Sequence, residues 1–175
     1  LGVPILHTVC GTGIFETACC LWVEAGTVVL GSGNRANSEG CRQVEEVLAN
    51  TIDLIIGVLQ VGSVRVYFPA EGGEHLYLAA ARGLSREFVE NPLVQRRALG
   101  EGLLGDVALQ GETVIAEDTS QVGALYREAV QKEGLQSVAY IPLRSKGRTV
   151  GVLSASSHFS EKFSSQQIEF LTSIG

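Results

Sequence analysis

Apolar residues spaced three or four positions apart predict a long helix that begins near residue 38. Those that share one face of this helix are Val44, Val47, Leu48, Ile52, Ile55, Val58 and Leu59. A repeat of this kind is typical of an amphipathic helix that packs one stripe against a core. Ser38 precedes the stripe and can cap the helix. We therefore expect a helix over about residues 38–60 with one buried stripe.

Runs of strand-forming residues on either side of turn residues predict two β-hairpins, and the first strand alternates between polar and apolar residues. The first joins SVRVYF (63–68) to HLYLAAARG (75–83), and the second joins SVAYIPLR (137–144) to TVGVLSASSH (149–158) through the turn SKGR. Alternation with glycine-containing turns is typical of antiparallel strands that bury one face. The side chains that alternate with the apolar face of the first strand are Ser63, Arg65 and Tyr67. Pro142 indicates an edge position or a bulge in the second hairpin.

The end of the chain predicts a second amphipathic helix. In FSSQQIEFLTSIG, Ser164 and Gln167 have the spacing of a capping box, in which each side chain accepts a hydrogen bond from the other residue's backbone amide. Ile168, Leu171 and Ile174 then follow on one stripe. We expect this helix and the first one to carry apolar stripes of the same kind.

The segment between the two hairpins predicts two or three short helices around one short strand and long loops. Long structured connections of this kind often form a binding cavity. The order helix, hairpin, helical segment, hairpin, helix predicts an α+β fold with a central antiparallel sheet of about five or six strands. We expect the N- and C-terminal helices on one face, and the loops and short helices around a cavity on the other.

Gly100, Gly102 and Gly105 in LGEGLLG (99–105) match the G-x-G-x-x-G spacing of dinucleotide-binding loops. The short strand TVIAED (113–118) ends in acidic residues at about the right distance for a ribose contact. However, VQRRALG precedes the glycines with polar residues where a buried parallel strand needs an apolar run, and Gly111 ends the following helix after about two turns. We therefore interpret these glycines as turn and helix-end residues.

Composition limits the partners. The 175 residues carry a formal net charge of −6, and the 13 Lys and Arg residues are scattered, which argues against a nucleic-acid surface. The sequence contains no apolar run long enough to predict a membrane span and no secretory signal, so we expect a cytoplasmic protein without a membrane partner. The chain begins with Leu and has no Met, so we also expect a piece of a longer polypeptide that holds an output domain.

From about residue 40 to the end, the sequence resembles a GAF domain, the small-molecule-sensing module of prokaryotic signalling proteins. RALGEGLLGDVALQGETVIAEDTS (97–120) is similar to that family's glycine-rich turn, short helix, strand and Asp. SVAYIPLRSKGRTVGVLSASSHFSEKFSSQQIEFL (137–171) is similar to its last hairpin and C-terminal helix. The resemblance implies a sensory domain over residues 38–175, preceded by a cysteine-rich extension over 1–37 that we expect to form a β-hairpin.

The resemblance implies a regulatory domain rather than an enzyme. Family members that attach a bilin do so through a Cys in the helical segment after the Asp, and GALYREAVQKEGL (123–135) has none, so we expect no covalent bilin. The free methionine sulfoxide reductases of this fold need cysteines beside the same strand, and residues 42–175 contain none. Without a thiolate, that nucleophilic chemistry is lost. We expect no catalytic residue, and the sequence names no cofactor.

Four residues are candidates for ligand binding: Asp118, Tyr126, Tyr140 and Ser154. Asp118 can accept a hydrogen bond from a ligand or, in the favoured interpretation, cap the turn through Thr119. Tyr126 and Tyr140 offer an apolar ring and a hydroxyl to orient a small molecule, but core packing explains either tyrosine equally well.

The four cysteines, Cys10, Cys19, Cys20 and Cys41, all lie in the first 41 residues. Four thiolates could hold a metal ion or an iron–sulfur cluster, and a redox or metal sensor is therefore an alternative function. Their spacing contains no C-x-x-C, and buried free cysteines are the favoured interpretation. His75 and His158 could serve as haem ligands, although ordinary surface histidines are favoured there too.

The terminal helices suggest how a signal could leave the domain. Helices with apolar stripes often pair in parallel across a dimer, where a small shift in packing acts as a switch. We expect a homodimer through the terminal helices, with an unidentified small molecule as the input and an output domain, such as that of a two-component system, in the parent chain. A purely structural dimerisation module is the other alternative.

Overall fold

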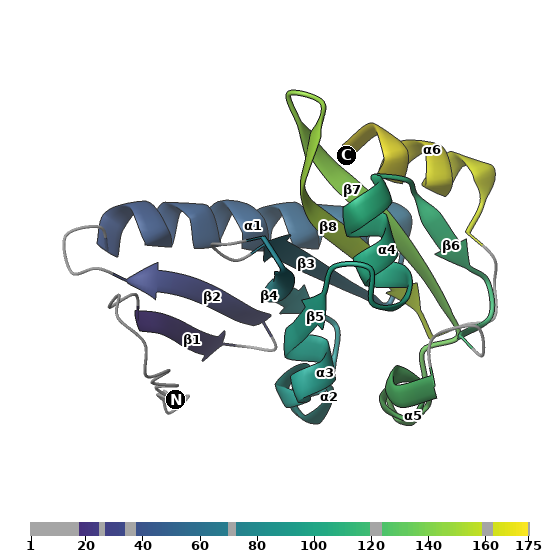
Figure 1. Cartoon of the computed structure of the whole chain (residues 1–175), viewed down its shortest axis with the longest axis horizontal. Helices are drawn as coiled ribbons and strands as arrows, with labels where there is room; N and C mark the ends of the chain where they lie inside the picture. The colour runs from purple at the N-terminus through teal and green to yellow at the C-terminus, as the bar shows by residue number, and fades with distance from the viewer. Residues whose placement is uncertain are drawn as a thin grey trace.

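The computed structural model describes residues 18–24, 27–33, 38–69, 73–119, 124–158 and 163–174, with side chains for 46–69, 73–119, 128–158 and 163–173. These residues form an antiparallel sheet between two groups of helices (Figure 1). The strands are β1 (Ala18–Glu24), β2 (Thr27–Gly33), β3 (Ser63–Pro69), β4 (His75–Arg82), β5 (Arg96–Ala98), β6 (Val114–Ala116), β7 (Ser137–Ser145) and β8 (Arg148–Ser157). Their order in the sheet is β1-β2-β4-β3-β8-β7-β6, with β5 beside β4.

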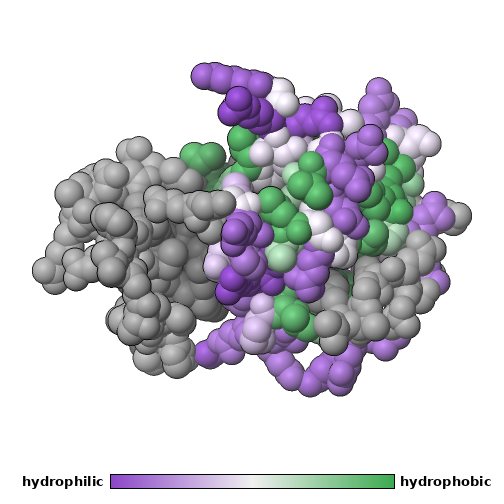
Figure 2. Space-filling model, in the orientation of Figure 1, coloured by the Kyte–Doolittle hydropathy of each residue, from purple (hydrophilic) through white to green (hydrophobic). Residues whose placement is uncertain are grey.

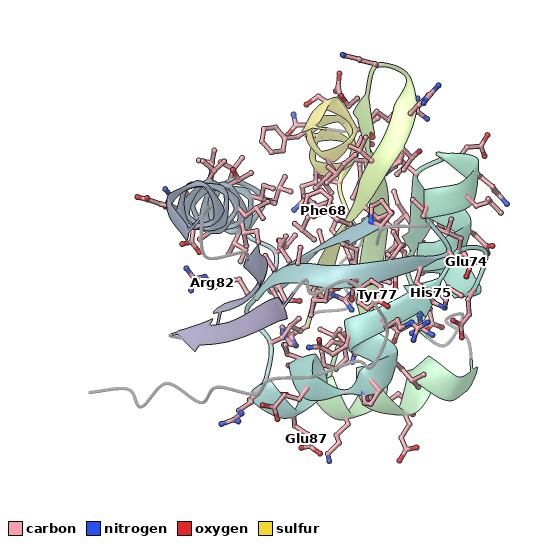
Figure 3. All side chains as sticks on the ribbon, turned by 60° about the vertical axis from the view of Figure 1, so that its left-hand side comes forward. Phe68, Glu74, His75, Tyr77, Arg82 and Glu87 are labelled. Atoms are coloured by element: carbon pink, nitrogen blue, oxygen red, sulfur yellow. The ribbon has the colours of Figure 1, made fainter. Side chains whose placement is uncertain are left out.

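The helices divide between the two faces of the sheet as the sequence predicts. On one face lie α1 (Ser38–Leu59) and α6 (Ser165–Ile174). On the other face lie α2 (Arg86–Glu90), α3 (Pro92–Gln95), α4 (Gly102–Gln110) and α5 (Ala124–Glu133). Figure 3 shows this arrangement, with Arg82 and Phe68 on the side of α1 and α6 and Glu87 on the opposite side. The α+β fold and the face of the terminal helices are therefore confirmed.

The six strands from residue 38 onward agree with the expected number. β1 and β2 add two strands at one end of the sheet, where they pair with each other from Ala18↔Gly33 to Glu24↔Thr27. Val28 and Val29 of β2 then pair with Ala81 and Ala80 of β4. β1 and β2 thus pair antiparallel and continue the sheet.

Strands β3 and β8 have alternating residues in two different hydrophobic cores. Val64 and Val66 of β3, with Leu153 and Ala155 of β8, belong to the core beneath α1 and α6. Tyr67 of β3 belongs to the core beneath α2 to α5. Because successive side chains of a strand point to opposite faces, each of these central strands is buried on both faces.

The apolar stripe predicted for α1 divides into two in the structure, which corrects the expectation of one buried stripe. Ile52, Ile55 and Leu59 are at most 4% exposed and contact the sheet, whereas Val47 and Val58 are 63% and 54% exposed. The buried residues repeat at three and four positions, so they form the side of the helix that faces the sheet. Val47 and Val58 lie on a different side of α1, which the sheet does not cover. Leu54, 62% exposed, extends this second stripe.

Two polar contacts hold α1 in place. Arg82 at the end of β4 donates from Nε and Nη2 to the two carboxylate oxygens of Asp53 on α1, at 2.8 and 2.7 Å. The hydrogen bond from Arg82 lowers the pKa of Asp53 below its ordinary value. Gln167 Nε2 donates to the Leu59 carbonyl at 2.7 Å, which joins the start of α6 to the end of α1.

The predicted capping box of α6 is confirmed. The Ser164 amide donates to Gln167 Oε1 at 2.7 Å, and the Gln167 amide donates to Ser164 Oγ at 3.2 Å. Gln167 therefore both caps its own helix and contacts α1 through the other end of its amide group.

The segment between the hairpins contains more elements than the sequence predicts, with four short helices and two short strands among its described residues. The extra strand, β5, escapes prediction because it has three residues, of which two are arginines. β5 pairs antiparallel with β4, which excludes the parallel strand and crossover of a dinucleotide-binding unit. Gly111 ends the nine-residue α4 with φ of 72°, as expected for a C-terminal cap.

The described residues contain no helix that is long and apolar enough to cross a membrane. On the face seen in Figure 2, hydrophobic residues are interspersed with hydrophilic ones.

Replacing Gly105 with alanine should destabilise the fold, because the new Cβ would lie 2.4 Å from the Ala98 carbonyl oxygen. Overpacking of this kind costs about 1–3 kcal/mol. Gly57→Ala is the matched control, since a Cβ there meets nothing within 4 Å and alanine is the better helix former by about 1 kcal/mol. Urea unfolding should show G105A less stable and G57A equally or more stable than the original chain. A stable G105A would contradict the close packing of α4 on β5.

Candidate functional site

The central strands bring a group of polar side chains together on the face covered by α2 to α5. Ser63 and Arg65 come from β3, and Ser154 and Ser156 come from β8. The register pairs Ser63 with Ser156 and Arg65 with Ser154, so the four side chains share one face and are neighbours. All four are at most 1% exposed. We call these four residues the polar cluster.

Arg65 organises the polar cluster. Its Nη2 donates to Ser154 Oγ at 2.8 Å and to Ser156 Oγ at 2.9 Å. Burying a guanidinium is costly unless hydrogen bonds and charges compensate for the lost water. The two serine hydroxyls provide part of this compensation, and they fix the position of the positive charge beneath the helices.

Phe88 of α2 covers the guanidinium, with the Arg65 Cζ 5.4 Å from the centre of the Phe88 ring. This distance is within the range of a cation–π interaction. α2 is joined in turn to α5, because Glu133 accepts hydrogen bonds from the Ser85 amide and the Ser85 hydroxyl. A second contact joins the same helices, in which Glu87 accepts a hydrogen bond from Lys132 and raises the pKa of that lysine.

One hydroxyl in the polar cluster has no hydrogen-bond partner among the described residues. Ser63 Oγ is fully buried opposite Ser156, and it neither donates nor accepts there. Leaving a buried hydroxyl unsatisfied costs about 1–3 kcal/mol. Ser137 Oγ is also unsatisfied, but Ser137 alternates with Val138 and so lies on the face of α1 and α6, where nothing in the structure explains it.

The structure brings two of the four predicted ligand-binding residues together. Tyr140 of β7 pairs with Ser154 of β8, and both are buried on the face of the polar cluster. Asp118 lies exposed in the turn after β6, directly before the buried Thr119. Tyr126 belongs to α5, and its side chain lies outside the described residues. Ligand binding by these four residues stays a prediction.

Sequence reasoning missed Arg65, Ser63 and Ser156 as site residues. Their alternation with apolar neighbours is typical of a strand with one face in water, and this pattern hides a polar residue that is buried. A signal was nevertheless present, because the long segment between the hairpins was expected to cover that same face. A charged residue in the middle of a strand that is covered on both faces indicates a buried charge.

The alternative sites fall mostly outside the described structure. Cys10 lies outside the described residues, as do the side chains of Cys19, Cys20 and Cys41. The residues that the structure describes contain no group of three or more His, Cys, Asp and Glu side chains that could hold a metal. His75 Nε2 lies 2.9 Å from Arg96 Nη2, and His158 is half-buried beside Gly62. His75 thus contacts an arginine, and His158 lies beside the residue that precedes β3.

The described residues thus form an antiparallel sheet with α1 and α6 on one face and α2 to α5 over the polar cluster on the other. A family model for the GAF domain matches residues 41–175, and the chain belongs to this family. No curated protein matches the sequence.

Solved structures of the same fold come from different kinds of protein. A domain of a protein assigned as a two-component sensor histidine kinase of Sinorhizobium meliloti is 23% identical, with a TM-score of 0.62 over 75% of this chain and 84% of that chain. The GAF domain of a phosphoenolpyruvate-protein phosphotransferase of Coxiella burnetii is 20% identical. Its TM-score is 0.63, and the match covers 74% of this chain and 76% of that chain. A type II free methionine-R-sulfoxide reductase of Thermoplasma acidophilum is also 20% identical. Its TM-score is 0.61, and the match covers 76% of this chain and 87% of that chain.

Two of these structures are single domains of proteins named as a sensor kinase and a phosphotransferase, and the third is a reductase. In the described part of this chain, the face covered by α2 to α5 presents a guanidinium, hydroxyls and aromatic rings. Residues 42–175 contain no cysteine that could act as a nucleophile. This donor set is suited to holding a small molecule by hydrogen bonds and charge.

Ser156→Ala and Ser63→Ala should have opposite effects on stability, although both serines are fully buried and face each other across β3 and β8. S156A removes an acceptor of the buried Arg65 and should cost about 1–3 kcal/mol. S63A removes a hydroxyl without a partner among the described residues, and it should be neutral or stabilise the fold by up to about 1 kcal/mol. Urea unfolding of the two variants tests this difference. Equal destabilisation would show that Ser63 has a structural hydrogen bond of its own.

Proposed function

We propose that the chain is a non-catalytic sensory domain that binds a small molecule between the sheet and α2 to α5. The family and the signalling proteins that share its fold support a regulatory role. The buried polar cluster supports ligand binding, because polar side chains in an otherwise apolar core are costly and usually have a structural or binding role. Tyr140 and Ser154 are the proposed ligand contacts within the described side chains, and Asp118 and Tyr126 complete the proposed site.

A single observation carries this proposal: β3 and β8 connect the polar cluster to the terminal helices. Arg65 lies between Val64 and Val66, which pack beneath α1 and α6, and Ser154 lies between Leu153 and Ala155, which do the same. A ligand that moves Arg65 or Ser154 acts on strands whose other face holds the two helices. Packed cores respond to such shifts by changing between discrete arrangements.

The second stripe of α1 supports a homodimer as the means of output. Val47, Thr51, Leu54 and Val58 are exposed and follow one another at spacings of four, three and four residues, which is the repeat of a coiled-coil seam. The occupant that we propose for this stripe is α1 of a second copy, because a parallel pair would place identical stripes against each other. A change in the packing of α1 and α6 would then alter the dimer.

The wider setting follows from the same proposal. The domain would report to an output domain of its parent chain in a prokaryotic signalling protein, such as a two-component system, in the cytoplasm. Catalysis is not proposed, since residues 42–175 offer no thiolate for the reductase chemistry of the fold.

A native mass spectrum of the freshly purified chain, compared with its denatured mass, tests the proposal. We expect a dimer that carries an added small-molecule mass, and we expect this mass to disappear on denaturation. Bare polypeptide in every native charge state would contradict a retained ligand and would favour the purely structural dimerisation module.

The same spectrum tests the dimer through two variants with matched exposure. Leu54→Glu should give monomers, because it places like charges in the seam. Leu109→Glu on α4 should leave the dimer intact, since Leu109 is 64% exposed compared with 62% for Leu54 but lies outside the stripe. Monomers of the unmodified chain would exclude α1 as the dimer contact.

A further inference from the structure

The polar cluster indicates which chemical group the site recognises. A guanidinium only donates hydrogen bonds, and it stays charged at every relevant pH. Ser154 and Ser156 accept from Arg65, so the proton of each hydroxyl is still available for a further acceptor. The cluster therefore presents a positive charge together with hydroxyl donors, and this combination complements an anion.

Ser63 gives a second, independent indication. Its hydroxyl is fully buried on the same face, next to Ser156, and has no partner among the described residues. Neighbouring positions of this face carry the apolar side chains of Ala81, Val138 and Val152. A serine at position 63 is thus less favourable for folding than alanine would be, which is typical of residues kept for binding.

The charge and shape of the cluster favour one class of anion. Arg65 carries one positive charge, and the other arginine of β3 and β8, Arg148, is exposed. Both hydrogens of Arg65 Nη2 are donated to Ser154 and Ser156, so a carboxylate would meet the guanidinium charge together with the serine hydroxyl donors, and one charge balances one carboxylate. Phe88 and Tyr140 lie on the same side of the sheet and can contact the apolar part of a ligand whose charged end meets Arg65.

We propose that Arg65, Ser63, Ser154 and Ser156 bind the carboxylate of a small organic monoacid, which is the ligand that the domain senses. This inference rests on the proposed function, because it assigns the chemistry of the same site. Arg65 binds the charge, and the serine hydroxyls donate to the carboxylate oxygens. Phe88 keeps the guanidinium in place beneath α2.

The test uses the whole chain and named probes. Sodium acetate, butyrate and benzoate are titrated by calorimetry and thermal shift at constant ionic strength, beside the neutral amides acetamide, butyramide and benzamide. Inorganic phosphate and nitrate are titrated in the same way. We expect at least one carboxylate to bind at least tenfold more tightly than its amide and than phosphate or nitrate.

Variants assign the binding to the cluster. Arg65→Gln should abolish carboxylate binding, and Ser63→Ala should weaken it about five- to tenfold although S63A is at least as stable as the original chain. The matched control is Arg148→Gln, which removes the same charge from an exposed position of β8 and should leave binding unchanged. S63A keeps the test valid if R65Q fails to fold.

Different results would overturn the carboxylate inference and the proposed sensory function. Equal binding of amides and carboxylates, a preference for phosphate or nitrate, or unchanged affinity in S63A would overturn the carboxylate inference and leave a ligand site in place. The inference is also wrong if no carboxylate binds. If, in addition, the native mass spectrum shows bare polypeptide, the proposed sensory function fails with it.

Discussion

The whole structure depends on central strands that are buried on both faces. In most antiparallel sheets one face packs on a core and the other meets water, so polar residues can alternate at no cost. β3 and β8 have helices on both sides, and their polar residues must therefore be satisfied inside the protein. Arg65 donates to Ser154 and Ser156 there, whereas the Ser63 hydroxyl has no hydrogen-bond partner among the described residues. The fold and the candidate site share these strands and cannot vary independently.

This constraint supports the proposal that the domain reports on a bound molecule. Val64 and Val66 on either side of Arg65 contact the core beneath α1 and α6, and Arg82 and Gln167 hold those helices by hydrogen bonds. A shift at the polar cluster moves strands to which both helices are attached. The coupling that we propose needs no long pathway, because it crosses the thickness of one sheet.

Local patterns allowed much of the fold to be predicted from the sequence. The two hairpins, the α6 capping box and the helix end at Gly111 follow from residue types that act on their own backbone or on near neighbours. The division of the α1 stripe could not be predicted, because the strands that cover Ile52, Ile55 and Leu59 but not Val47 and Val58 come from distant parts of the sequence. The buried charge of Arg65 was missed for the same reason, since burial on the second face comes from α2 to α5. Ser154 and Tyr140 were named as candidates, but their pairing required the register of β7 and β8.

A double-mutant cycle tests the central claim most directly, with Ser156→Ala in the polar cluster and Ile55→Val on α1, on opposite faces of the sheet. Unfolding free energies are measured for each single variant and for the pair, with exposed Ser145→Ala and I55V as the control pair. If the central strands couple the two faces, S156A and I55V should differ from additivity by more than about 0.5 kcal/mol, and the control pair should be additive. Additivity within about 0.3 kcal/mol for S156A and I55V would contradict coupling through the sheet.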